Sequence, residues 1–215
     1  MHRAEEDYLK TIYKLTVERD RKLARTTDIA TAVGNTDQTV NEMVKRLAKK
    51  RMVTFMRYRG VSLTTDGLQE AERLVRNHRL WEVFLVEKLD YSWTDVHDEA
   101  EKLEHASSEE LIDRIDRFLG RPDYCVHGNA IPRPDGSHPE TSQRSLKDLD
   151  PGAVMTVGRV IDERTFLEHM DRYRIRIGSR IRVVAKDDFN GVLTVDVDGK
   201  QSVISTSIAN RIYGR

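Results

Sequence analysis

The sequence predicts a mainly α-helical fold with a small β domain at its C-terminal end, and three observations support this. Apolar residues recur at helical spacing through much of residues 4–120. Residues 154–205 instead hold short apolar or alternating runs with turns at Asn190-Gly191 and Asp198-Gly199. All five prolines lie in residues 121–152, which we expect to form a structured loop. A chain of 215 residues is long enough to bury two or three small cores.

The first 88 residues are predicted to hold a helix-turn-helix and a hairpin between two longer helices. A first amphipathic helix covers about 4–19, and a long helix capped by Thr65 continues to about Lys88. Between them we expect a helix over 28–33 capped by Thr26 or Thr27 and stopped by Gly34, a helix from Asp37 to about Lys50 capped by Thr36, and strands over 52–57 and 61–64. Tyr58-Arg59-Gly60 would form a basic tip, so the order indicates a winged helix-turn-helix.

The remainder is predicted to be helical and then β. Thr94 is expected to start a helix that runs through His105, and Ser107 with Glu110 has capping-box spacing for a helix that ends near Gly120. Beyond the proline-rich loop we expect a helix at about 163–173 and strands over 154–161, 181–184, 193–197 and 203–205. These elements predict a small antiparallel barrel.

Charge is distributed unevenly, although its total is zero. Residues 1–76 carry 16 Lys/Arg and 11 Asp/Glu, residues 77–150 carry 9 and 17, and residues 151–215 carry 11 and 8. The basic first third suits a polyanion and the acidic middle suits cations, although solvated charged faces would give the same pattern. No apolar run reaches the roughly 20 residues of a membrane span, the N-terminus lacks the apolar core of a secretion signal, and a single cysteine fits a reducing compartment, so we expect a cytoplasmic protein.

The helix from Asp37 presents a polar face that is typical of a DNA-recognition helix. The second helix of a helix-turn-helix enters the major groove, where base edges offer distinct donors and acceptors. We expect Gln38, Asn41 and Glu42 to contact bases, and we expect phosphate contacts from Thr36, Thr39, Lys45, Arg57 and Arg59. The predicted partner is double-stranded DNA. The alternative is a helical hairpin that serves only for packing.

Histidines and carboxylates of the middle third have the spacing of metal ligands. His97, Glu101, Glu104 and His105 project from one helical face, and His78 and Glu82 form an i, i+4 pair on the preceding helix. Oxygen and imidazole donors favour Mn²⁺ or Fe²⁺, although Zn²⁺ and later metals would also bind. Cys125 and His127, two residues apart, can both reach one ion. The alternatives are solvated salt bridges and a buried structural cysteine.

Four segments together resemble the diphtheria toxin repressor and manganese transport regulator family, and the resemblance covers the whole chain. They are Glu6-Asp7-Tyr8-Leu9-Lys10-Thr11-Ile12-Tyr13, His78-Arg79-Leu80-Trp81-Glu82, Val96-His97-Asp98-Glu99-Ala100-Glu101-Lys102-Leu103-Glu104-His105 and Cys125-Val126-His127-Gly128-Asn129-Ala130-Ile131-Pro132. The resemblance implies a winged helix-turn-helix DNA-binding domain over 1–74, a helical metal-binding and dimerisation domain over 75–140, and a C-terminal SH3-like β-barrel over 150–215. It also implies a metal-dependent repressor of metal-uptake genes that binds palindromic promoter DNA as a homodimer.

The resemblance implies two metal sites in each chain. The first would contain Asp7, Glu101, Glu104 and His105, with His78 nearby. The second would contain Glu82, Cys125 and His127, with His97 and an acidic ligand from the third domain, for which Asp162 is the candidate. Some iron-responsive members have a sulfur ligand where this chain has Asp7 and Glu101, which favours Mn²⁺ over Fe²⁺. Lys10 stands where some manganese-responsive members place an acidic ligand, which leaves a closely paired two-ion site there unsupported.

Two other classes of protein can also use these residue types. A metallohydrolase can use His, Glu and Cys ligands to activate water, but the sequence holds no His-Glu-x-x-His run. A helix-turn-helix regulator that senses an organic ligand would carry the acidic helix face only as structure. We expect a regulator with no enzymatic activity, no organic substrate and no membrane partner.

Overall fold

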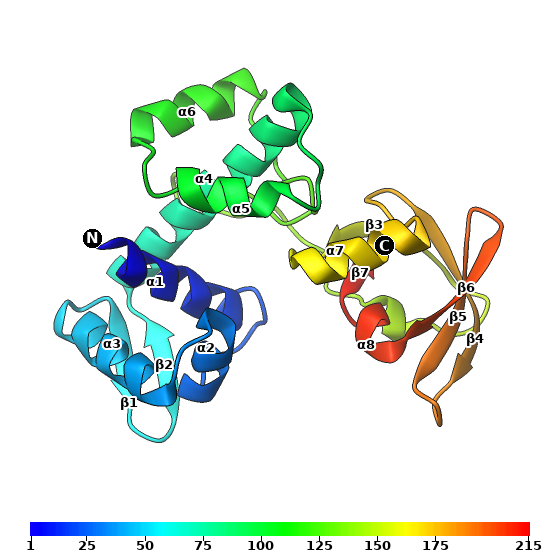
Figure 1. Cartoon of the computed structure of the whole chain (residues 1–215), viewed down its shortest axis with the longest axis horizontal. Coiled ribbons are helices and arrows are strands. Elements are labelled where there is room, and N and C mark those ends of the chain that lie inside the picture. Colours follow the sequence, from blue (N-terminus) through cyan, green and yellow to red (C-terminus); the bar gives the residue numbers. More distant parts are fainter. The chain divides into compact units, whose positions relative to one another are not determined.

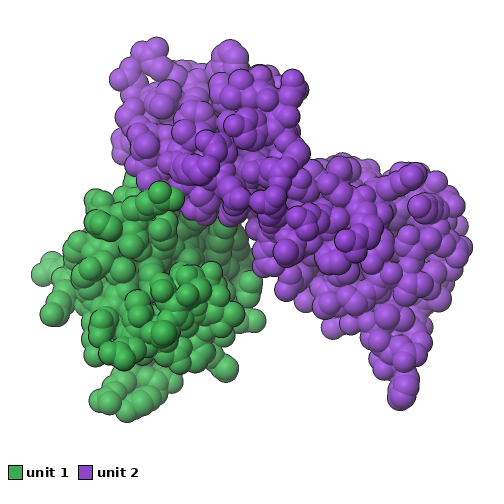
Figure 2. Space-filling model, viewed as in Figure 1, with its two compact units in different colours: residues 1–77, 132–137 green, residues 78–131, 138–215 purple.

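The computed structural model describes residues 1–215, and its contacts divide the chain into two compact units (Figure 2). Unit 1 comprises residues 1–77 and 132–137, and unit 2 comprises residues 78–131 and 138–215. The predicted fold class, mainly α with a small C-terminal β part, is confirmed. None of the helices combines the length and the apolar content that a membrane span requires.

Unit 1 is a winged helix-turn-helix. Its elements are α1 (Arg3–Thr16), α2 (Thr26–Val33), α3 (Asp37–Lys49), β1 (Val53–Met56), β2 (Gly60–Leu63) and the first part of α4 (Thr65–Leu89) (Figure 1). The two strands pair antiparallel from Val53 with Leu63 to Met56 with Gly60. Their core includes fully buried side chains from α1, α2 and α3, among them Leu9, Ile29 and Leu47. Burial of these apolar stripes fixes α3 against the other helices and leaves its polar face outside.

Two of the expected helix caps in unit 1 are displaced by one residue. Thr36 caps α3 as predicted, since its hydroxyl accepts a hydrogen bond from the Thr39 amide at 3.2 Å, and Gly34 ends α2 in the left-handed region with φ +66°. The expected threonine cap of α2 is wrong, because Arg25 occupies the N-cap position without a side-chain hydrogen bond. The cap of α4 is Thr64 and not Thr65, because the Thr64 hydroxyl accepts from the Gly67 amide at 3.1 Å.

The helical part of unit 2 contains the rest of α4, α5 (Val96–Leu103) and α6 (Glu109–Phe118). Helix α5 is shorter than predicted at both ends. It starts later because residues 92–95 form a turn in which the Ser92 hydroxyl accepts from the Asp95 amide at 3.1 Å. The cap of α6 is Ser108 and not Ser107. The Ser107 hydroxyl instead accepts a hydrogen bond from the Trp81 indole at 2.8 Å, so it ties the start of α6 to α4.

The β part of unit 2 is a five-stranded antiparallel sheet with the strand order β6-β5-β4-β3-β7. Its strands are β3 (Val154–Val160), β4 (Arg180–Asp187), β5 (Val192–Val197), β6 (Lys200–Ser205) and β7 (Ile212–Gly214), and its helices are α7 (Arg164–Tyr173) and α8 (Thr206–Ala209). Register shifts within the β3–β7 and β4–β5 pairs bend the sheet around a buried core. The sequence did not predict α8 or β7, since both are too short for a periodic pattern. The proline-rich loop contains one short 3₁₀ helix, η1 (Leu146–Asp148).

Candidate metal centre and nucleic-acid interface

A first cluster of candidate ligands lies where α5 ends. Glu101 is on α5, while Glu104 and His105 follow it directly, and the ligand atoms of these three residues lie within 4.8 Å of one another. Glu104 is fully buried, and its Oε1 lies 3.2 Å from Nε2 of His105. Its Oε2 lies 2.5 Å from Nδ1 of His78 on α4. Within unit 2 the structure therefore brings together the predicted residues of the first site.

Asp7 belongs to a different unit from the other predicted ligands of that site. It lies on α1 of unit 1, in the middle turns of the helix, and its side chain is partly buried. Its participation in the first site stays a prediction.

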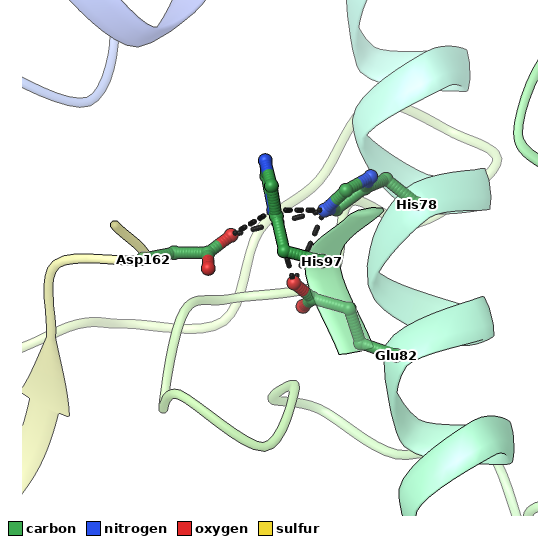
Figure 3. A group of neighbouring side chains, drawn as sticks. All are labelled: His78, Glu82, His97 and Asp162. Atoms are coloured by element: carbon green, nitrogen blue, oxygen red, sulfur yellow. Dashed lines mark hydrogen bonds and ion pairs between the residues drawn. The ribbon is translucent and has the colours of Figure 1, made fainter. Parts of the chain in front are cut away.

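A second cluster joins α4, α5, the 125–131 loop and the residues after β3. Oε1 of Glu82 lies 3.1 Å from Nε2 of His78, 3.8 Å from Nδ1 of His97 and 3.4 Å from Nδ1 of His127. Asp162 approaches from beyond β3, with Oδ2 3.1 Å from Nδ1 of His97 (Figure 3). This cluster gathers all the residues expected in the second site.

His78 and His97 occupy positions that helical spacing alone did not predict. His78 faces both clusters, since Nδ1 contacts Glu104 and Nε2 contacts Glu82. His97 shares a helical face with Glu101, and their side chains are 3.6 Å apart, but Nδ1 of His97 is closer to Asp162. Of the two roles expected for His97, the structure favours membership of the second cluster.

The 125–131 loop holds Cys125 and His127 in place. The Cys125 amide donates to the Asn129 carbonyl at 2.9 Å, and the Gly128 amide donates to the Cys125 carbonyl at 2.8 Å. Gly128 has φ +78°, and a Cβ there would lie 2.0 Å from the Gly158 carbonyl oxygen, so only glycine fits this approach to β3. The next contact, from the Val160 amide to the His127 carbonyl at 3.0 Å, fixes the histidine backbone against the β sheet.

Trp93 orients the imidazole of His127. Nε2 of His127 donates to the Trp93 carbonyl at 2.8 Å, and the two rings stack with their centroids 5.7 Å apart. A proton held on Nε2 leaves Nδ1 as the lone-pair atom whenever this imidazole is neutral. Nδ1 is the atom that faces Glu82, Asp162 and Cys125, whose Sγ is 4.0 Å away. Sequence analysis missed Trp93, because a backbone carbonyl has no sequence signal.

The carboxylates and imidazoles of the second cluster shift one another's pKa. Burial alone would raise the pKa of Glu82, but His127 and His78 outweigh it and hold this pKa well below its ordinary value. Burial and the charge of Glu82 favour a higher pKa for Asp162. Hydrogen bonds from His78 and His97 outweigh both effects, so the pKa of Asp162 lies below its ordinary value. Burial lowers the pKa of His127, yet Glu82 and its other partners raise it to about 12. Protonated imidazoles therefore balance the carboxylates, and protons would have to leave when a cation binds.

The residues of the second cluster fit a divalent cation. Oε2 of Glu82 and Oδ1 of Asp162 are buried and accept no hydrogen bond, although buried carboxylate oxygens are normally satisfied. The donor set combines carboxylate oxygen and imidazole nitrogen with the one thiol, Cys125. Burial and Glu82 raise the pKa of that thiol, so it remains protonated until a cation displaces its proton. These donors suit divalent first-row transition metals.

The candidate DNA-binding residues lie on α3 and on the β1–β2 turn of unit 1. Thr36, Gln38, Thr39, Glu42 and Lys45 are exposed on or beside α3. Asn41 is half-buried, and its side-chain amide donates to the Asp37 carbonyl within the helix at 2.8 Å. Arg57 and Arg59 are exposed on the turn, where the Arg57 guanidinium lies over the ring of Tyr58 at 4.8 Å. Tyr58, which is 91% exposed, was not among the predicted residues.

Three family profiles cover almost the whole chain. The N-terminal DNA-binding domain of the iron-dependent repressors matches residues 1–61, and their metal-binding and dimerisation domain matches residues 64–133. The FeoA domain matches residues 144–215. The order of these matches is the order of the three hydrophobic cores.

Individual relatives agree with the profiles. The iron-dependent repressor IdeR of Mycobacterium leprae is 32% identical over 159 residues, which are 71% of this chain and 68% of the relative. A manganese-dependent transcriptional repressor in complex with manganese has 35% identity and a TM-score of 0.89, with 98% of both chains covered. ScaR with bound Cd²⁺ has 32% identity and a TM-score of 0.87, again with 98% of both chains covered. The chain therefore belongs to the diphtheria toxin repressor family of metal-dependent transcriptional repressors, and it is a DNA-binding regulator and not an enzyme.

Proposed function

We propose that this protein is a manganese-responsive repressor that binds palindromic promoter DNA as a homodimer and controls genes for metal-ion transport. The observation that carries the proposal is the first cluster, in which Glu101, Glu104 and His105 offer oxygen and nitrogen donors without sulfur. The absence of the sulfur ligand that some iron-responsive members of the family have favours Mn²⁺ over Fe²⁺. Such donors suit Mn²⁺ and Fe²⁺ better than soft metals. Fe²⁺ is the alternative effector, and Zn²⁺ or other divalent ions would bind in vitro.

Two centres would hold the metal. In the first, Asp7 would join Glu101, Glu104 and His105, an inference that rests on the position of Asp7 in the motif at the start of the chain. In the second, the ligands would be Glu82, His97, Cys125, His127 and Asp162, which the contacts within unit 2 support. We also retain the division into domains over 1–74, 75–140 and 150–215.

The carboxylates would make DNA binding depend on the ion. In the proposed site Glu101, Glu104 and Asp7 would repel one another as long as no cation compensates their charges. A divalent cation supplies that compensation when bound. Because Asp7 belongs to the DNA-binding domain and Glu101 to α5, shared ligation would favour the conformation in which α3 can enter the major groove. The gain in DNA affinity equals the difference in metal affinity between the two conformations.

Chelation tests this proposal. With a chelator present, we expect a mobility shift on promoter DNA to disappear, because the ligand carboxylates then favour the conformation that does not bind. Addition of Mn²⁺ in excess of the chelator should restore the shift in the natural chain but not in Glu101→Ala. Equal DNA binding with and without chelator would contradict the metal switch, and restoration by Fe²⁺ at lower free concentration than Mn²⁺ would favour the iron-responsive alternative.

The homodimer would form through an apolar face of the helical part of unit 2. Leu111 and Phe118 are seven residues apart on α6 and are 42% and 66% exposed, and the ring of Phe118 lies 6.1 Å from that of Phe84. Both belong to the segment that matches the dimerisation domain. Exposed apolar side chains that share one helix face are typical of protein interfaces.

Phe118→Asp is expected to convert the dimer to a monomer at micromolar concentration, because a charge would be buried in the apolar interface. Light scattering coupled to gel filtration measures the mass. Phe189→Asp is the matched control, since Phe189 is 97% exposed but lies between β4 and β5, outside the dimerisation segment. A Phe118→Asp variant that remains dimeric would place the interface elsewhere.

A further inference from the structure

We propose that the second centre binds two divalent cations, which the carboxylates of Glu82 and Asp162 bridge. One ion would be held by His78 and His97, and the other by Cys125 and His127. This inference rests on the proposed metal dependence, but it adds a binding position to it.

The candidate ligands form two groups. The ligand atoms of His78, Glu82, His97 and Asp162 all lie within 4.8 Å of one another, and those of Glu82, Cys125 and His127 form a second group of the same kind. Nε2 of His78 and Nδ1 of His97 are 3.1 Å apart, and Cys125 and His127 are 4.0 Å apart. The two groups share Glu82. The pair His78 and His97 can therefore hold one ion beside this carboxylate, and the pair Cys125 and His127 can hold another.

Asp162 has the orientation of a bridging ligand. Its Oδ2 lies 3.1 Å from Nδ1 of His97 and 3.8 Å from Nε2 of His78, while its Oδ1 lies 3.6 Å from Nδ1 of His127. Each oxygen of this one carboxylate therefore faces a different pair. Figure 3 shows Asp162 and Glu82 approaching the two histidines from separate elements. A carboxylate that binds a single ion would not need to present its oxygens to both pairs.

Glu82 provides independent support. Its side chain is fully buried, Oε1 contacts both His78 and His127, and Oε2 has no hydrogen-bond partner. A buried oxygen without a partner is energetically costly, so its retention indicates a ligand that satisfies it. When Cys125 binds as a thiolate, its proton passes to the solvent, and the thiolate and two carboxylates carry three negative charges. One divalent cation would leave this buried set with a net charge of −1 and two would leave it at +1, so the three negative charges accommodate a second ion.

The test is to count bound ions in the full-length protein with Co²⁺ as the probe. Equilibrium dialysis followed by elemental analysis gives ions per chain, and the thiolate-to-cobalt charge-transfer band reports the Cys125 position. We expect His97→Ala to lose one ion per chain and keep the band, and Cys125→Ala to lose one ion and the band. The double variant should lose two ions. The exposed His138→Ala is the control and should keep the count of the natural chain.

A loss of only one ion in the double variant would overturn the bridged pair and leave a single ion with mixed ligands. Should His97→Ala fold poorly by circular dichroism, His97→Gln preserves the size and polarity of the side chain and serves instead. Asp162→Asn gives a second test, since it replaces one bridging oxygen and is expected to weaken both positions. If DNA binding still requires metal while the second centre holds one ion, this inference fails and the proposed function stands. If the DNA affinity is the same with and without metal, the proposed function itself fails.

Discussion

Glu104→Ala is expected to abolish metal-dependent DNA binding and to weaken Mn²⁺ binding at the first centre by about 100-fold or more. Glu104 is fully buried and contacts both His78 and His105, so its loss would remove a proposed ligand and the contact that orients a second imidazole. Removal of partners that only orient ligands typically lowers metal affinity by about 10–100-fold, and a direct ligand should cost at least as much. Calorimetric titration with Mn²⁺ and fluorescence anisotropy on labelled promoter DNA measure the two effects.

Glu99→Ala is the matched control for that substitution. Glu99 is a carboxylate on the same helix, but it makes an exposed ion pair with Lys102 and contacts neither cluster. We expect natural metal and DNA affinities in this variant, because an exposed pair contributes little. Glu104→Gln separates ligation from folding, since it keeps the volume of the side chain. If Glu104→Gln and Glu104→Ala both bind DNA with the affinity of the natural chain, Glu104 has no part in the metal switch.

The second large effect concerns two residues of α3 that should affect DNA binding in different ways. Gln38 is exposed in the first turn, where recognition helices contact base edges, and Lys45 is exposed two turns later. Gln38→Ala should reduce discrimination between the operator and a single-base variant by about 1–3 kcal/mol, which is about 5- to 150-fold. Lys45→Ala should weaken binding to all sequences and reduce the slope of log affinity against log salt by about 1.

Anisotropy titrations at several salt concentrations, with the operator and its variants, distinguish these two outcomes. Lys200→Ala removes an exposed lysine of the C-terminal sheet and should leave both the specificity and the salt slope unchanged. Equal losses on all sequences in Gln38→Ala would show that Gln38 contacts the backbone of the DNA and not its bases.

The sequence predicted the long elements of the fold well, because apolar spacing records burial directly. The helix α3 and its Thr36 cap follow from a stripe of apolar residues and one hydroxyl at the right distance. The caps of α4 and α6 were displaced by one residue because Thr64 stands beside Thr65 and Ser108 beside Ser107. Either neighbour satisfies the local pattern, and only tertiary contacts, such as the bond from Trp81 to Ser107, select between them.

Helical spacing identified the candidate ligands but not their grouping, which only the family resemblance indicated. Spacing placed His97 on the same helical face as Glu101, yet its position between two clusters depends on Asp162, which lies 65 residues further along the chain. The two-sided contact of His78 likewise requires both α4 and the end of α5. The support of His127 by the Trp93 carbonyl follows from chain geometry alone, which no pattern of residue types encodes.

The most direct test of the central claim is reciprocal linkage between metal and DNA. If Mn²⁺ raises the affinity for promoter DNA by a certain factor, saturating promoter DNA must raise the affinity for Mn²⁺ by the same factor, because one coupling free energy governs both. Titration of the metal-free protein with Mn²⁺, with and without saturating DNA, measures that factor. We predict a tighter Mn²⁺ affinity in the presence of DNA in the natural chain and no change in Glu104→Ala. An Mn²⁺ affinity that is the same with and without DNA in the natural chain would contradict the account.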